Sequence, residues 1–183
     1  MGLSINDVKP GLTILVENEV YLVLEADHVK PGKGSAFVRA KLKNLKNGAV
    51  QDRTFKADDE IEPAFVEERK LQYLYNSANI YYFMDQETFE EISIPNDYIQ
   101  DKIKFLKDNL EVTACFYKYD LLNINLPNSV EYKVIHTEPG FKGDTAKSGS
   151  KPAQIETGAI IQVPLFIEAG DIIKVDTRTG EYI

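Results

Sequence analysis

Short strand-like segments separated by turn residues recur along almost the whole of this 183-residue chain. Within residues 36–45, Val38, Ala40 and Leu42 alternate with charged side chains, and a period of two is typical of a strand with one buried face. The Asn47-Gly48 dipeptide that follows favours a hairpin, because both positions tolerate positive φ. Further strand patterns occupy residues 12–16, 20–24, 50–55, 70–75, 79–84, 110–119, 121–126, 132–135, 160–163, 172–175 and 181–183. These patterns predict an all-β protein.

Two breaks in composition divide the chain into three predicted domains. The chain becomes acidic and tyrosine-rich near residue 64, and Pro127-Asn128 marks the second break, so the predicted domains are residues 1–64, 65–127 and 128–183. The first reads as a small barrel or curled sheet with a basic arm. In the second, cap residues and apolar spacing within 95–107 predict one short helix. A five-stranded barrel with a helix between its third and fourth strands is the OB-fold pattern.

The arm of the first domain carries the most distinctive motif, Lys30-Pro31-Gly32-Lys33-Gly34. Pro31 fixes one φ angle, and the two glycines permit left-handed turn geometry while leaving Lys33 without bulky neighbours. A thin hairpin tipped with one cation suits a narrow crevice lined by phosphates. Lys33 is therefore the candidate functional residue.

The charge distribution also indicates a nucleic-acid partner. The net charge of −8 argues against general RNA or DNA binding. Residues 28–56, however, hold eight basic side chains and one acidic one. Arg39, Lys41 and Lys43 are expected on one face of the strand that leads from the tip, where they would contact RNA. The alternative is a solvated charged strand.

Membrane and secreted classes are not expected. No apolar run approaches the roughly 20 residues that span a bilayer, and the first residues lack the basic and apolar regions of a secretion signal. We therefore expect a cytoplasmic protein. Cys115 is the single cysteine, so no intrachain disulfide can form, and its strand-like surroundings indicate a structural thiol.

Signatures of catalysis are weak. His28 and His136 fall in different predicted domains, with no ligand spacing that suits zinc and no serine nucleophile motif. The segment around Lys33 fails as a phosphate-binding loop, because Asp27 and Gly34 stand where that motif needs glycine and Ser or Thr. We expect a protein that is not an enzyme and binds no cofactor or metal.

Three motifs together resemble the bacterial elongation factor P family over the whole chain. They are the tip loop with Ala36-Phe37-Val38-Arg39, the Glu138-Pro139-Gly140 and Gly143-Asp144-Thr145 segments of a glycine-rich loop, and the stretch from Lys151-Pro152-Ala153 to Gly170. The resemblance implies three small β-barrels in an L shape about the size of a tRNA, a KOW/SH3-like barrel followed by two OB-fold barrels.

The resemblance also implies a function and a set of partners. A protein of this family would bind the 70S ribosome and its rRNA beside P-site peptidyl-tRNA, between the P and E sites, and relieve stalls at consecutive prolines. Lys33 would face the acceptor end of the tRNA and be lengthened by a lysine-modifying enzyme. The loop of Gly143, Asp144 and Thr145 would lie near the E-site mRNA codon. We expect a monomer.

Two alternatives stay open from the sequence. One is an elongation-factor-P-like paralogue with other clients, and the other is a free-standing single-stranded RNA-binding OB protein. The tyrosines could stack on bases or pack within the sheets, and packing is favoured. They are Tyr73, Tyr75, Tyr81 and Tyr82.

Overall fold

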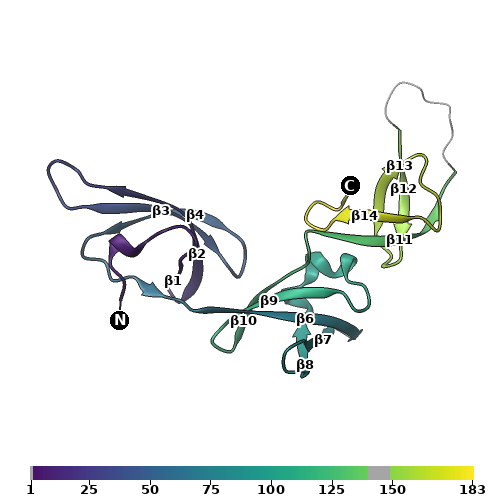
Figure 1. Ribbon diagram of the computed structural model, residues 1–183, viewed down its shortest axis with the longest axis horizontal. Helices are drawn as coiled ribbons and strands as arrows, with labels where there is room; N and C mark the ends of the chain where they lie inside the picture. The colour runs from purple at the N-terminus through teal and green to yellow at the C-terminus, as the bar shows by residue number, and fades with distance from the viewer. Residues whose placement is uncertain (1, 140–148) are drawn as a thin grey trace. The chain divides into compact units, whose positions relative to one another are not determined.

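The computed structural model describes residues 2–139 and 149–183. Its regular structure consists of three five-stranded sheets and three short 3-10 helices (Figure 1). The all-β fold predicted from the strand patterns is confirmed. Among the described residues, no helix has the length and apolar character needed to cross a membrane.

The first sheet has the order β4-β3-β2-β1-β5 and curls around the 3-10 helix η1 (Figure 1). Its core gathers alternate strand residues such as Ile14, Val38 and Leu42, together with Ile5 and Val8 from η1 and the residue after it. The elements are η1 (Ile5–Asp7), β1 (Thr13–Val16), β2 (Glu19–Val29), β3 (Phe37–Asn44), β4 (Val50–Lys56) and β5 (Glu62–Pro63). β2 and β3 are the strands that form the arm.

The middle sheet has the order β10-β9-β6-β7-β8. Its strands are β6 (Val66–Ser77), β7 (Ile80–Asp85), β8 (Glu91–Pro95), β9 (Glu111–Tyr117) and β10 (Asp120–Asn125). The 3-10 helices η2 (Asn96–Tyr98) and η3 (Gln100–Phe105) lie between β8 and β9. The predicted helix is present, but it is 3-10 and broken at Ile99, whose φ of −132° and ψ of 5° are not helical.

The third sheet has the order β13-β12-β11-β14-β15, and its two edge strands β13 and β15 contact one another, which closes it into a barrel. Its strands are β11 (Ser129–Thr137), β12 (Ser150–Ile155), β13 (Ile160–Pro164), β14 (Ile172–Asp176) and β15 (Glu181–Tyr182). Numbered within each sheet, the middle and third sheets share one strand order, 5-4-1-2-3 read in one direction. The repeated order, with a helical segment after the third strand of the middle sheet, agrees with the OB pattern.

The chain groups into two compact units, residues 1–69 with 114–123 and residues 70–113 with 124–183. Within the second unit, η3 packs directly against the third sheet. The Phe105 and Tyr132 rings lie 6.3 Å apart between centroids, and Thr157 donates a hydrogen bond to the Lys104 carbonyl oxygen at 2.6 Å. The domain limits at residues 64 and 127 stay predictions.

Candidate RNA-contacting arm

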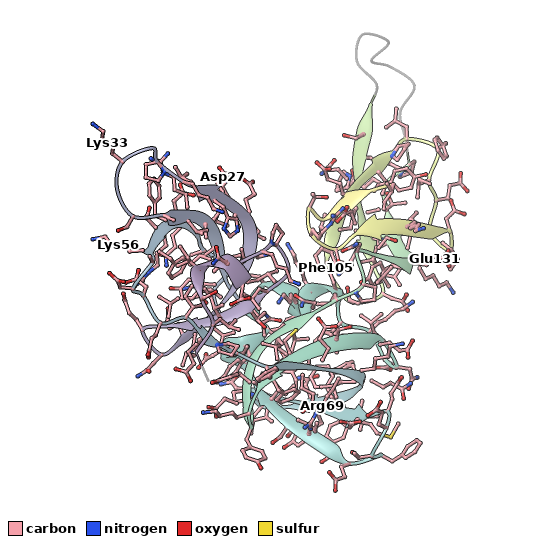
Figure 2. All side chains as sticks on the ribbon, turned by 60° about the vertical axis from the view of Figure 1, so that its left-hand side comes forward. Asp27, Lys33, Lys56, Arg69, Phe105 and Glu131 are labelled. Atoms are coloured by element: carbon pink, nitrogen blue, oxygen red, sulfur yellow. The ribbon has the colours of Figure 1, made fainter. Side chains whose placement is uncertain are left out.

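The loop between β2 and β3 carries Lys33 at its end. Residues 30–35 are all exposed, and Figure 2 shows Lys33 beyond the ribbon with its amine pointing away from the sheet. No hydrogen bond or ion pair within the described part of the chain involves the Lys33 side chain. Gly34 has a φ of +115°, a conformation that L side chains rarely adopt, so glycine is required there. The loop therefore presents one unengaged cation.

The arm behind the loop is held in place by a continuous ladder and by one side chain. β2 and β3 pair from Tyr21 with Asn44 to Val29 with Phe37, with one register shift near Glu25. The His28 ring nitrogen Nε2 lies 2.9 Å from the carbonyl oxygen of Val8, and Val8 is fully buried in the first core. The arm is thus tied to the barrel close to its tip.

The outer face of β3 carries the predicted cations. Val38, Ala40 and Leu42 are at most 2% exposed, so the intervening side chains point to the other face. Arg39 and Lys43 are exposed and Lys41 is half-buried. The prediction that Arg39, Lys41 and Lys43 share one face is confirmed, whereas their contact with RNA stays a prediction.

Acidic side chains on the neighbouring strands change the charge of this face. The Lys41 amine lies 2.9 Å from a carboxylate oxygen of Glu25 on β2, and Asp52 pairs with Lys41 from β4. The hydrogen bond and charge of Glu25 raise the pKa of Lys41 above its usual value. Asp27 lies opposite Arg39. The count over residues 28–56 missed Glu25 and Asp27, because both precede that window although their strand lies beside it.

A shallow hollow of about 470 Å³ opens near the tip on the β3–β4 side. Its lining is Ser35, Ala36, Phe37, Arg39, Thr54, Lys56, Ala57 and Asp58. The Arg39 guanidinium lies 5.5 Å from the centroid of the Phe37 ring. Lys56, which the sequence analysis did not single out, is exposed and pairs with Phe37 across the ladder. The hollow thus combines two cations, two hydroxyls, an aromatic ring and one carboxylate.

The four tyrosines that could stack on bases are divided between the core of the middle sheet and its surface. Tyr73 and Tyr81 are buried, at 6% and 9% exposure, whereas Tyr75 and Tyr82 stack on one another with ring centroids 4.6 Å apart. Tyr75 donates a hydrogen bond to Glu91, so a carboxylate stands beside this pair. Two of the four tyrosines are therefore core residues, and the stacked pair has a carboxylate beside it, which would repel the phosphates of a stacked nucleic acid.

The remaining site residues lie in the glycine-rich loop. Gly143, Asp144 and Thr145 fall outside the described residues. Beside them in sequence, the amine of Lys151 on β12 donates a hydrogen bond of 2.8 Å to the carbonyl oxygen of Glu138. Lys151 is only 7% exposed, and no sequence signal distinguished it from the surface lysines.

Within the residues that the structure describes, three or more metal-ligating side chains nowhere gather into a possible metal site. Cys115 is buried on β9, as expected for a structural thiol. These observations leave the arm as the candidate functional site.

Three family models match the chain in succession. Residues 4–61 match the elongation factor P KOW-like domain, residues 66–124 match the elongation factor P OB domain, and residues 130–183 match the elongation factor P C-terminal domain. Each of the three sheets is matched by one family model over most of its length, and β5 lies between the first two matches. The KOW-like and OB assignments agree with the predicted fold.

Relatives match over almost the entire chain. Elongation factor P of Moorella thermoacetica is 58% identical over 181 residues, which cover 99% of this chain and 98% of the relative. Elongation factor P of a Thermoanaerobacter species is 52% identical over 181 residues, which again cover 99% of this chain and 98% of the relative.

Solved structures show the same fold at low identity. Eukaryotic translation initiation factor 5A from Methanococcus jannaschii superposes with a TM-score of 0.53 at 19% identity, over 69% of this chain and 92% of that one. An initiation factor 5A family protein from Naegleria fowleri gives 0.55 at 14% identity, over 69% and 98%. Together with the full-length relatives and the three domain matches, these findings lead to one conclusion: the chain is a translation elongation factor and belongs to the elongation factor P family.

Proposed function

We propose that this factor binds the 70S ribosome beside P-site peptidyl-tRNA, between the P and E sites, and accelerates peptide-bond formation at consecutive prolines. The observation that carries the proposal is the position of Lys33 at the end of a narrow, anchored arm, with its amine free of partners among the described residues. A free cation on a thin hairpin can enter a crevice lined by phosphates, where a bulkier element would not fit.

The proposed action is one of alignment. Proline is a stiff and poor nucleophile in peptide-bond formation, and the effective molarity of reacting groups falls steeply when they are misplaced. A cation held against the acceptor end of the tRNA would restrict its motion without taking part in the chemistry. The factor would then be an accessory to the ribosomal peptidyl transferase and not an enzyme.

Lys33 is also the proposed site of a covalent modification. Its side chain is exposed, and a Cβ added at Gly32 would meet no heavy atom within 4 Å, so a modifying enzyme has access from that side. Lengthening the side chain would extend its reach toward the peptidyl transferase centre. No dissociable cofactor is part of the proposal.

The other contacts complete the proposal. The loop of Gly143, Asp144 and Thr145 would face the small subunit near the E-site codon. The factor would act as a cytoplasmic monomer, and the acidity of the chain, with its net charge of −8, would discourage binding to free RNA.

A reconstituted translation system that lacks this factor provides the test. Protein purified from its native host, so that any modification is present, is added to the synthesis of a Pro-Pro-Pro reporter and of a matched Ala-Ala-Ala reporter. We expect the factor to increase the full-length product of the proline reporter and to leave that of the alanine reporter unchanged. An unchanged proline reporter would contradict the proposal, and tighter binding to isolated single-stranded RNA than to ribosomes would favour the free RNA-binding alternative.

A further inference from the structure

The strand register sorts the charges of the arm into rows across its outer face. Residues that pair across antiparallel strands point to the same side, so each row takes one residue from β2, one from β3 and one from β4. From the tip toward the barrel the rows are Val29–Phe37–Lys56, Asp27–Arg39–Thr54, Glu25–Lys41–Asp52 and Leu22–Lys43–Val50. Their formal charges are +1, 0, −1 and +1.

The third row is the one in which acid exceeds base. Lys41 is ion-paired with Glu25 at 2.9 Å, and Asp52 adds a second carboxylate on the other side. An approaching phosphate would have to displace Glu25 and would also meet the charge of Asp52. RNA could therefore contact Lys41 only by breaking its ion pair with Glu25, which costs free energy. The row also separates Lys43 from the cations near the tip.

The tip side of this row differs in its charge. Lys30 and Lys33 in the loop, and Arg39 and Lys56 beside the hollow, form no ion pair with any described residue. Three acidic side chains lie near them: Asp27, Asp58 and Asp59, whose carboxylate accepts a hydrogen bond of 2.8 Å from the Lys56 backbone amide. Ser35 and Thr54 add hydroxyls that can donate hydrogen bonds to a phosphate oxygen.

We infer that RNA contacts the arm only on the tip side of the Glu25–Lys41–Asp52 row, with Lys56 and Arg39 holding the sugar-phosphate backbone at the hollow. The inference rests on the proposed function and narrows it, since it assigns Lys56 to the contact and removes Lys41 and Lys43. Glu25 and Asp52 act as specificity residues. They keep the outer face of the arm from binding RNA along its length, so that the factor is retained only where the tip fits.

Lys56→Gln and Lys41→Gln form a matched pair for the test, because each removes one lysine from the same face. Binding to 70S ribosomes carrying P-site peptidyl-tRNA is measured from 50 to 200 mM salt. One lost phosphate contact lowers the salt slope by about 0.7 to 0.9 and weakens binding roughly three- to ten-fold. We expect this change for Lys56→Gln and no comparable change for Lys41→Gln, with unchanged thermal unfolding of both. Equal effects of the two substitutions, or wild-type binding by Lys56→Gln, would overturn the inference.

The acidic row is tested separately with the double variant Glu25→Gln, Asp52→Asn and an isolated single-stranded RNA. Freeing Lys41 should tighten binding to this RNA at least three-fold and steepen its salt slope, and adding Lys41→Gln should reverse both changes. An unchanged affinity would contradict the role given to the acids. These outcomes are separable from the proposed function, which fails only if the unaltered protein does not bind ribosomes or does not act on the proline reporter.

Repeating the Lys56→Gln binding measurement with ribosomes whose P site is empty distinguishes the source of the phosphate that Lys56 contacts. The binding defect disappears if tRNA supplies this phosphate and persists if rRNA does.

Discussion

Tyr132 donates a hydrogen bond of 2.6 Å to the carbonyl oxygen of Phe105, and Tyr132 is fully buried. The bond joins β11 of the third sheet to the end of η3. The Lys107 amine lies 5.4 Å from the centroid of the Tyr132 ring and donates to the Glu131 carbonyl oxygen at 2.6 Å. These contacts explain why residues 70–113 and 124–183 form one compact unit.

Replacing Tyr132 with Phe should destabilise this unit. The substitution keeps the ring but leaves the buried Phe105 carbonyl without this donor, which costs about 1–3 kcal/mol. Urea unfolding followed by tyrosine fluorescence measures the effect. Tyr119→Phe is the control, because Tyr119 is 97% exposed and its substitution should leave the midpoint unchanged. Equal midpoints for both variants would show that the hydrogen bond contributes nothing net.

The raised pKa of the Tyr132 phenol predicts that the protein loses stability at high pH. Burial raises the pKa of the Tyr132 phenol above the value of about 10 that it has in an unfolded chain. The neutral phenol is therefore favoured by folding, and its contribution is complete below pH 10 and lost as the pH rises toward the folded pKa. Thermal unfolding between pH 8 and 11, in parallel with Tyr132→Phe, should show a shallower decline in the variant. Parallel curves would contradict this assignment.

Asp176, at the turn between β14 and β15, predicts a loss of stability at low pH. The hydrogen bonds and charge of Arg178 hold the pKa of Asp176 well below its usual range. The stabilisation is present above the unfolded pKa of about 3.9 and is lost as the pH falls below it. Asp176→Asn should therefore lower the melting temperature at pH 7 and have a smaller effect at pH 2.5. An equal loss at both values would mean that the charge of Asp176 is not the cause.

Much of this fold could be predicted from the sequence, and the exceptions have physical reasons. β3 was clear because its alternation continues over the whole strand. β12 was missed, because Pro152 breaks the usual strand composition and because Lys151 is a charged residue at a buried position. β8 was missed as well, since Glu91–Pro95 has only two large apolar residues. The turn after β3 spans more than the expected two residues, because the buried Asn44 side chain accepts hydrogen bonds from the amides of Lys46 and Asn47.

The candidate site was only partly predictable. Lys33 and its glycine neighbours were clear from local turn chemistry, which depends on adjacent residues alone. The neutralisation of Lys41 by Glu25 depends instead on the pairing of β2 with β3, which places residues 16 apart side by side. Lys56 was overlooked for the same reason, because its relation to Phe37 exists only in the β3–β4 ladder.

The two tip glycines should respond differently to substitution. Gly34→Ala places a Cβ on a residue with a φ of +115°, which costs about 1–3 kcal/mol locally and redirects the loop. Gly32→Ala adds a Cβ to open space, so its loop should keep its path. In the proline-reporter assay we expect reduced rescue by Gly34→Ala and near-normal rescue by Gly32→Ala, with a melting temperature that is lowered by a few degrees for Gly34→Ala and unchanged for Gly32→Ala, so that both proteins are folded in the assay. The reverse order would contradict the conformational role of Gly34.

The rate of Pro-Pro bond formation on a single ribosomal turnover tests the central claim most directly. Native-host protein, its Lys33→Ala variant and a Lys30→Ala control are compared at saturating concentration, with folding verified by circular dichroism. The account predicts acceleration by the native protein, loss of most of that acceleration in Lys33→Ala, and retention of most of it in Lys30→Ala. Full acceleration by a well-folded Lys33→Ala protein would contradict the assignment of Lys33 as the functional end of the arm.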